Sequence, residues 1–327
     1  MPGILPPITE LEVTNPEDLV NAVRSAIFEP CLLARTSMKS RLARVVCPEV
    51  TLDFASLGSS FLFTGVTSKD LYTLIFVLDC PIQGKAFNFG VEHHDGYMAL
   101  FAPSGIVDAL TPMGYSNATL SLSADVFHRE VEHLLPEIPD RVVRNGLAFR
   151  VGMVAQQYLR SLLMEVRAAM SDPARPLAGL PARVALERRL IDTFLGALHD
   201  GISGDGPRLR SRAAQPERRL RQAREFLEAS VDRLFHLDEL CRELGMSRRG
   251  IEVMFRKSLG TTPGRYLHCQ RLNAVRRSLV RADPDSTMVK EVAHGWGFLH
   301  MGHFGQNYRA LFGETPRATL ERTRDSR

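Results

Sequence analysis

The sequence predicts a β-rich α+β front domain, a cupin-like sheet or barrel with added helices, followed by an all-α rear domain. The 327 residues, 44% of them hydrophobic, exceed one ordinary domain. Short aromatic and β-branched runs fill the first half, whereas helical periodicity fills the last third. A Gly- and Pro-containing stretch, Gly201 to Pro207, indicates a linker between them. We therefore expect domains at 1–200 and 217–323, joined by residues 201–216.

The front domain is expected to place strands before helices. A helix-like stretch, Glu17 to Phe28, follows Asn15-Pro16. Strands are predicted where aromatic and β-branched residues cluster between Gly, Pro, Ser and Asp, at 51–54, 61–64, 71–77, 87–89, 97–101 and 118–122. Helices are then predicted at about 125–135, 150–170 and 181–199. Strands followed by helices give the α+β class, with an antiparallel sheet or a small barrel.

The charge of the chain is divided unevenly. The whole chain has a net charge of +4. Residues 208–327 hold 24 Lys and Arg and 14 Asp and Glu, a net of +10, which leaves −6 for residues 1–207. A basic rear domain behind an acidic front domain predicts a polyanion partner for the rear domain alone.

Composition also argues against several classes of protein. The five cysteines include no C-x-x-C pair, which disfavours a disulfide framework and a thiolate zinc site. The N-terminus lacks the basic and apolar regions of a secretory signal, and no run is long enough to cross a membrane. A reducing, cytoplasmic setting is therefore expected, without a membrane partner.

The rear domain contains an internal repeat. Apolar residues at helical spacing run from Leu237 to Leu244, and the same spacing recurs 52 residues later from Val289 to Trp296. A turn with a glycine follows each, at Gly245 and Gly297, and a second helical pattern follows each turn. Both copies close on the same G-x-T-P motif. Helix, glycine turn and helix form the helix-turn-helix unit, and two copies in register disfavour an ordinary helical hairpin.

The repeat predicts the layout of the rear domain. We expect helix-turn-helix units at about 237–258 and 288–312, with a linking helix at about 263–281. Ser247 is placed to cap the second helix of the first unit, the helix that enters the major groove when such a unit binds DNA. The linking helix is expected to have a buried stripe of Tyr266, Leu272, Val275 and Leu279 and an outer face of Arg265, Arg271, Arg276 and Arg277.

Residues from about Glu217 to Thr323 closely resemble the DNA-binding domain of the AraC/XylS family of transcription regulators. The residues that carry the resemblance are Ala293, Gly297-Phe298, Phe304, Phe312-Gly313 and Thr315-Pro316. Within that family, the segments most similar to the ethanolamine-utilisation regulators are 272–277, 296–298 and 311–314. The front domain is similar only in outline to the effector and dimerisation domains of this family.

The resemblance implies a sequence-specific, double-stranded-DNA-binding transcription regulator, and an activator in particular. It implies that an unidentified small-molecule effector binds the front domain and that the chain forms a homodimer. It also implies contact with RNA polymerase on activation.

The resemblance further assigns positions that face DNA. Base-reading positions would be Arg249, Glu252 and Val253 in the first recognition helix and Met301, Gly302, His303 and Gln306 in the second. Arg249 can donate two hydrogen bonds to guanine, Glu252 can accept one from cytosine, and Gln306 can bind adenine. Residues expected to contact phosphates are Arg248, Arg256, Lys257, Arg265 and Arg309.

The second recognition helix departs from the family pattern. His300 stands where many relatives have a Ser or Asp cap, and Gly302 weakens the helix by about 1 kcal/mol relative to Ala. The second unit is therefore expected to bind with less sequence specificity than the first.

Aromatic residues of the predicted strands are the candidates for an effector pocket: Phe61, Phe63, Tyr72, Phe87, Phe89 and Tyr97. Each of them also fits the plain core of a sheet. The cluster Glu92-His93-His94-Asp95 has metal-ligand side chains, but neighbouring residues of a strand face opposite sides. We interpret it as a loop histidine pair and predict no metal ion, no cofactor and no catalytic residue.

Three alternative functions remain open from the sequence. The first is a constitutive DNA-binding regulator without a ligand. The second is a DNA-repair alkyltransferase, for which Cys31, Cys47 and Cys80 are too few and too scattered to form a reactive centre with zinc. The third is a cupin metalloenzyme, which requires further His or Glu ligands on other strands.

Overall fold

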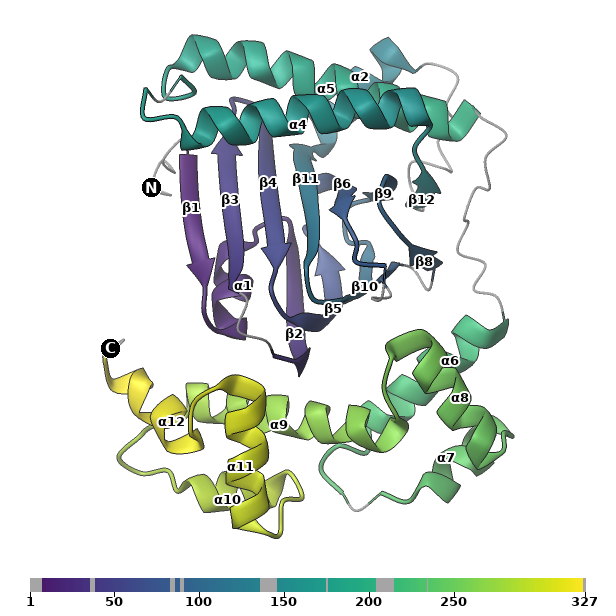
Figure 1. Ribbon diagram of the computed structural model, residues 1–327, viewed down its shortest axis with the longest axis vertical. Helices are drawn as coiled ribbons and strands as arrows, with labels where there is room; N and C mark the ends of the chain where they lie inside the picture. The colour runs from purple at the N-terminus through teal and green to yellow at the C-terminus, as the bar shows by residue number, and fades with distance from the viewer. Residues whose placement is uncertain are drawn as a thin grey trace. The chain divides into compact units, whose positions relative to one another are not determined.

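The computed structural model in Figure 1 describes residues 8–35, 39–82, 86–88, 91–135, 146–174, 176–203, 215–233 and 235–325. The chain divides into two compact units. The front unit comprises residues 1–30, 38–58 and 63–212, and the rear unit comprises residues 31–37, 59–62 and 213–327. The expected α+β class for the front and the all-helical class for the rear are confirmed.

Two sheets form the β-rich part of the chain. The seven-stranded sheet has the order β1 (Ile8–Val13), β3 (Ser40–Val46), β4 (Val50–Leu57), β11 (Tyr115–Ser123), β6 (Leu71–Asp79), β9 (Tyr97–Phe101) and β12 (Leu147–Arg150). The five-stranded sheet has the order β2 (Ala26–Ala34), β5 (Ser60–Thr67), β10 (Ile106–Thr111), β7 (Ala86–Asn88) and β8 (Val91–His93). A short helix, α1 (Pro16–Ala22), separates β1 from β2.

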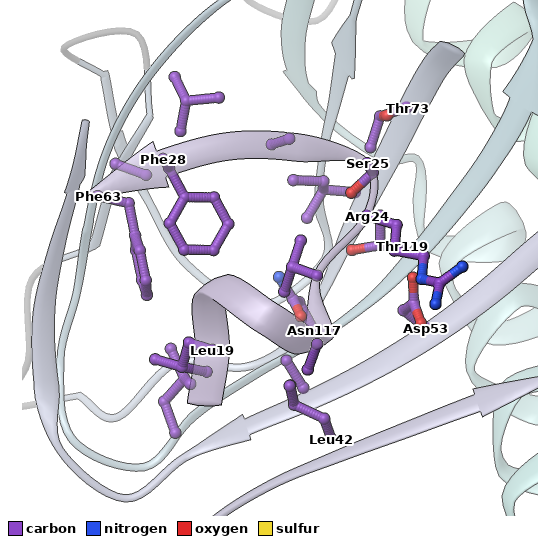
Figure 2. Close-up of a pocket in the computed structure, with 18 of the residues that line it drawn as sticks. Leu19, Arg24, Ser25, Phe28, Leu42, Asp53, Phe63, Thr73, Asn117 and Thr119 are labelled. Carbon is purple, nitrogen blue, oxygen red and sulfur yellow. The ribbon is translucent and has the colours of Figure 1, made fainter. Parts of the chain in front are cut away.

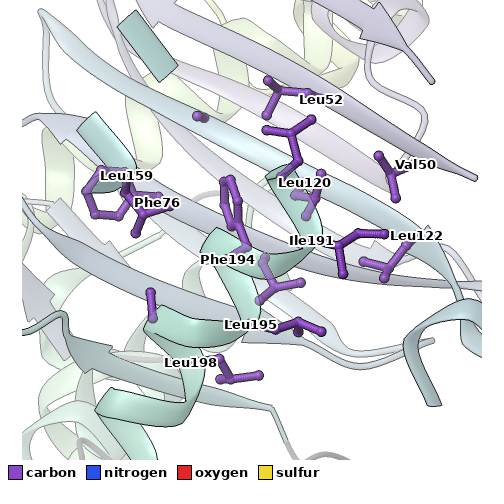
Figure 3. Packing of buried hydrophobic residues seen from close by; sticks show 14 of the residues in the cluster. Val50, Leu52, Phe76, Leu120, Leu122, Leu159, Ile191, Phe194, Leu195 and Leu198 are labelled. Atoms are coloured by element: carbon purple, nitrogen blue, oxygen red, sulfur yellow. The ribbon is translucent and has the colours of Figure 1, made fainter. Parts of the chain in front are cut away.

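One face of the seven-stranded sheet packs against helices. These are α2 (Ala124–Leu134), α4 (Met153–Ser171) and α5 (Leu180–Ser203). Alternate residues of the central strands supply the apolar side of the contact, and Figure 3 shows them facing α5: Leu52, Phe76, Leu120 and Leu122 against Ile191, Phe194, Leu195 and Leu198. This layer of buried apolar side chains is the main hydrophobic core of the front unit.

The other face of the same strands carries small and polar residues. On β11, Asn117 and Thr119 alternate with the core residues Ala118 and Leu120. The same alternation places Asp53 and Ala55 on β4 and Thr73 on β6 away from the helices. Short polar side chains fill less space than leucine or phenylalanine, so this face leaves a cavity.

Several expectations for the front unit are wrong in detail. The helix expected at 17–28 ends at Ala22, because Ala26–Ala34 forms β2. His93 lies in strand β8 and is buried, not in a loop. Helix α5 continues through Ser203, so the first residues of the expected linker are helical, and residues 204–214 lie outside the described residues.

From residue 215 onward, the described residues of the rear unit form helices joined by turns and loops. In chain order they are α6 (Gln215–Glu228), α7 (Leu237–Leu244), α8 (Arg248–Leu259), α9 (Pro263–Arg281), α10 (Val289–Gly295), α11 (Met301–Phe312) and α12 (Pro316–Asp325). Figure 1 shows α7 and α8 near one end of α9 and α10 and α11 near the other. This is the expected layout of two helix-turn-helix units joined by one helix.

All five cysteines lie within the described residues, and none forms a disulfide. None of the described helices combines the length and the apolar composition needed to cross a bilayer. Among the described residues, His, Cys, Asp and Glu do not gather into a group that could hold a metal ion.

Candidate nucleic-acid interface and ligand cavity

The first helix-turn-helix unit is built by local signals around its turn. Helix α7 ends at Gly245, whose φ of 60° is the left-handed conformation that glycine adopts without a Cβ penalty. Ser247 then caps α8, because its Oγ accepts a hydrogen bond of 3.1 Å from the backbone N–H of Gly250. These two residues set the direction in which α8 leaves the turn.

Helix α8 has one buried side and one exposed side. Ile251, Phe255 and Leu259 are buried at the i, i+4 and i+8 positions. The base-reading candidates Arg249 and Val253 lie on the exposed side, and Glu252 is half-buried with its carboxylate 3.9 Å from Arg256. Side chains at the N-terminal end of this helix are therefore accessible to a groove.

The second unit repeats this geometry 53 residues later. Phe304, Tyr308 and Phe312 are buried in α11 where Ile251, Phe255 and Leu259 are buried in α8. The turn glycine Gly297 has a φ of 81°. Gly302, His303, Gln306 and Arg309 are exposed, and Met301 is half-buried.

The N-terminus of α11 differs from that of α8. Its N-cap is His300, whose side chain makes no capping hydrogen bond. The first backbone N–H groups of α11 therefore lack the side-chain acceptor that Ser247 gives to α8.

Helix α9 lies between the two helix-turn-helix units. Its 19 residues span about 28 Å at 1.5 Å per residue. Thr262 caps its start, and the expected buried stripe of Tyr266, Leu272, Val275 and Leu279 is buried. Residues on nearly all of its sides are buried, so α9 is the central helix of the rear unit.

The arginines expected on an outer face of α9 occupy different environments. Arg265 is exposed, and Arg271 is half-buried and donates to the backbone oxygens of Val231 and Arg233. Arg276, expected on the outer face, is instead fully buried. Its Nη1 lies 2.8 Å from Glu314 Oε1, and its guanidinium lies 4.7 Å from the centre of the Phe312 ring. Arg276 therefore joins α9 to the residues that follow α11 and is not free for DNA.

Cations on the exposed side of the first unit make only weak internal contacts. Arg248 lies 3.0 Å from Asp238, and both side chains are more than half exposed. Arg256 and Lys257 are exposed on the last turn of α8. Exposed ion pairs contribute little to stability, so a phosphate can replace Asp238 at Arg248 at little cost.

A cavity of about 340 Å³ lies in the front unit, on the small and polar face of the seven-stranded sheet. Its wall is mostly apolar and includes Leu19, Phe28, Leu42, Phe63 and Phe101. Figure 2 shows Phe28 and Phe63 close together, and their rings make an edge-to-face contact with centroids 5.1 Å apart. The volume is in the range of small-molecule sites.

The aromatic residues proposed for an effector pocket are distributed over several places. Phe63 lines the cavity. Tyr72 instead stacks on Phe127 on the helix side of the sheet, and Tyr97 lines a smaller neighbouring cavity. Phe61 and Phe87 are not among the residues that line either cavity, and Phe89 lies outside the described residues.

The polar residues of the cavity were missed by sequence reasoning. Thr73, Asn88 and Asn117 line it, together with the ion pair of Arg44 and Asp53. The alternation of polar and apolar residues along Tyr115–Ser123 is the signal that could have placed a polar interior face there.

Known proteins resemble the rear unit most strongly. Residues 240–322 match a family described as a helix-turn-helix domain. Over 101 residues the chain is 42% identical to the "Probable thc operon regulatory protein" of Rhodococcus erythropolis, and this match covers 31% of the chain and 30% of that protein. The chain therefore matches less than a third of the length of this relative.

One further relative matches most of the chain, and one solved structure matches about a third of it. Over 294 residues it is 26% identical to the "XylDLEGF operon transcriptional activator 3" of Pseudomonas putida, a match that covers 86% of the chain and 85% of that protein. The crystal structure of a probable AraC family transcriptional regulator from Rhodopseudomonas palustris is 34% identical, with a TM-score of 0.31. That match covers 32% of this chain and 97% of the other.

Proposed function

Because the chain belongs to the AraC/XylS family, we propose that it is a sequence-specific DNA-binding transcription regulator. One observation carries the proposal: the rear unit holds two helix-turn-helix units whose recognition helices bury matching residues and expose matching faces. The basic rear residues supply the charge that attracts phosphates.

We propose Arg249, Glu252 and Val253 of α8, and Met301, Gly302, His303 and Gln306 of α11, as the base-reading residues. Phosphate contacts are assigned to Arg248, Arg256, Lys257, Arg265 and Arg309. The exposure of Arg249, Gln306 and Lys257 supports these assignments.

Control by a small-molecule effector is the second part of the proposal. The cavity of the front unit supports it, since the cavity is largely apolar and has a few polar groups in its wall. The constitutive alternative predicts that no small molecule binds in this cavity. Activation is supported by the relative named as an operon activator. Contact with RNA polymerase on activation is part of the same proposal.

A homodimer formed through the front unit completes the proposal. Four apolar side chains of α4 are between 62% and 76% exposed: Met153, Val154, Tyr158 and Met164. Exposed apolar side chains gathered on one element favour a protein interface. Sedimentation of the full chain as a monomer at micromolar concentration would rule the homodimer out.

The DNA-repair alkyltransferase alternative is disfavoured by the state of the cysteines. Burial raises the pKa of Cys47 to about 12 and that of Cys80 to about 11, and it also raises the pKa of Cys31. A nucleophilic cysteine needs the opposite shift, because the thiolate is the reactive form. The relatives, in addition, are named as regulators.

The test is a selection of duplexes from a random DNA library with the full chain. We expect enrichment of two short sequence elements whose centres are about 10 base pairs apart, the spacing of successive major grooves on one side of DNA. Enrichment of no sequence would overturn the proposal, and enrichment of one short element only would contradict base reading by one of the two helix-turn-helix units.

A further inference from the structure

We propose that the cavity of the front unit binds a neutral, mostly apolar molecule that carries a hydrogen-bond donor, such as a phenolic or alcoholic hydroxyl group. The inference rests on the effector control proposed above and adds the chemical class of the effector. It follows from the wall of the cavity, from its unpartnered polar atoms and from its charges.

The apolar part of the wall selects an apolar body. Leu19, Phe28 and Phe63 lie on one side of the view in Figure 2, and Ser25, Thr73 and Thr119 lie on the other. The cavity therefore has an apolar side and a polar side. A molecule with a ring or chain at one end and a polar group at the other matches this division.

Three residues that line the cavity each have a buried side-chain polar atom with no hydrogen-bond partner within the described part of the chain. These atoms are Oγ1 of Thr73, Oδ1 of Asn88 and Oδ1 of Asn117. Thr73 is 2% exposed and Asn88 is 6% exposed. Buried polar groups are nearly always paired in folded proteins, because an unpaired one retains its desolvation cost.

These atoms specify the polar group of the ligand. The two amide oxygens can only accept hydrogen bonds, and the threonine hydroxyl can donate or accept. The side chain of Asn117 also makes a hydrogen bond with Tyr115, which leaves its Oδ1 as the free acceptor. A ligand hydroxyl or N–H group that donates a hydrogen bond to one of these amide oxygens supplies the partner that the oxygen lacks.

The charges of the cavity favour a neutral ligand. Arg44 donates to both carboxylate oxygens of Asp53, at 2.6 and 3.2 Å, and to the backbone oxygen of Ala22 at 2.9 Å. Burial raises the pKa of Asp53, and the bond from Arg44 opposes that rise. Arg24, the other cation in the wall, is exposed, and its charge also opposes the rise in the pKa of Asp53. A carboxylate in place of the hydroxyl group could not donate to either amide oxygen and would be repelled by them.

The experiment measures binding of matched probes to the full chain by isothermal titration. The probes are 2-naphthol, 2-methoxynaphthalene and 2-naphthoate, together with 4-propylphenol and its methyl ether as a smaller pair. We expect the naphthol or the phenol to bind at least about tenfold more tightly than its ether, which lacks only the donor. Equal affinity of both hydroxyl compounds and their ethers, tighter binding of 2-naphthoate, or binding of no probe would overturn the proposal.

Variants link the preference to the cavity. Thr73→Val and Asn117→Leu each remove an unpartnered polar atom, so the advantage of the hydroxyl probe over its ether should fall several-fold. Ser121→Ala is the matched control, since Ser121 Oγ is also buried and unpartnered among the described residues but does not line the cavity. An unchanged advantage in both cavity variants would contradict the proposal, and circular dichroism establishes that each variant is folded.

A parallel measurement separates the two proposals. Binding of the same preparation to its selected duplex, without any probe, reports on DNA recognition alone. If the duplex binds and 2-naphthoate is the preferred probe, only the ligand class is wrong. If the duplex binds and no probe binds, the proposal of effector control by this cavity is contradicted, whereas the proposal of DNA recognition is supported. If a hydroxyl probe binds and no duplex does, the proposed regulator function is the part that fails.

Discussion

Arg249 and Lys257 are both exposed on α8, but they are expected to contact different parts of DNA. Arg249 lies at the helix start, where a guanidinium can bond guanine O6 and N7. Arg249→Ala should therefore weaken the selected duplex by about 1–3 kcal/mol and relax preference at one base pair. Lys257→Ala should weaken selected and random duplexes alike and flatten the salt dependence.

Fluorescence anisotropy on both duplexes at several salt concentrations measures these effects. Arg242→Ala is the control, because Arg242 is an exposed arginine of α7 with no assigned DNA contact. Equal loss on both duplexes for Arg249→Ala would remove it from the base-reading set.

His93 is a buried residue whose protonation is linked to stability. Burial lowers its pKa to about 4, compared with an ordinary value of 6.5. Above pH 6.5 the ring is neutral in both states. As the pH falls from 6.5 toward 4, the unfolded chain binds a proton that the folded chain does not, so stability falls. Between pH 7 and pH 5 this group should remove about 2 kcal/mol from the free energy of unfolding.

Denaturant unfolding at pH 7 and pH 5 tests this link. His93→Gln should lose about 2 kcal/mol less than the unmodified chain over this interval. His94→Gln is the control, because the side chain of His94 is 58% exposed. If the two variants show the same pH dependence, burial of His93 is not the cause.

Among the elements, the two recognition helices differ in their caps. Ser247→Ala should destabilise the rear unit by about 1 kcal/mol, because it removes the hydrogen bond to Gly250. His300→Ser should stabilise it by about 0.5–1 kcal/mol, because serine supplies the acceptor that α11 lacks. Thermal unfolding measures both changes. Destabilisation by His300→Ser would mean that the helix start is held by other contacts.

Arg276 of α9 and Glu314, two residues beyond α11, form the most buried ion pair among the described residues of the rear unit. Arg276→Met removes the buried partner of Glu314, which keeps its contact with Arg322 at 3.1 Å, and should cost about 2 kcal/mol. Arg317→Ala removes an exposed pair with Glu321 and should cost at most about 0.5 kcal/mol. Similar costs for both variants, measured by denaturant unfolding, would contradict the role assigned to Arg276.

The sequence predicts the helices of the rear unit well because their signals are local. Turn glycines, the Ser247 cap and helical spacing lie within a few residues of the feature they specify. Strands such as β1 and β3 were missed, since they pair with segments distant in the chain and carry charged residues. The burial of Arg276 depends on Glu314, 38 residues away, and the cavity depends on which face of each strand meets the helices.

For the whole molecule, we expect α9 to set how the chain reads DNA. A continuous helix about 28 Å long joins the two helix-turn-helix units, and one turn of DNA is about 34 Å long. Because the spacing is built into a buried helix, the two recognition helices cannot follow elements that are moved apart. DNA recognition should therefore depend steeply on the spacing of the elements.

The most direct test measures affinity for the selected duplex after insertion of about 5 base pairs, half a turn, between its two elements. We expect affinity to fall on the order of 100-fold, to that of a duplex with one element scrambled, because the second unit can no longer engage. Full affinity after the insertion would contradict the account, since it would show that the two helix-turn-helix units do not read DNA together.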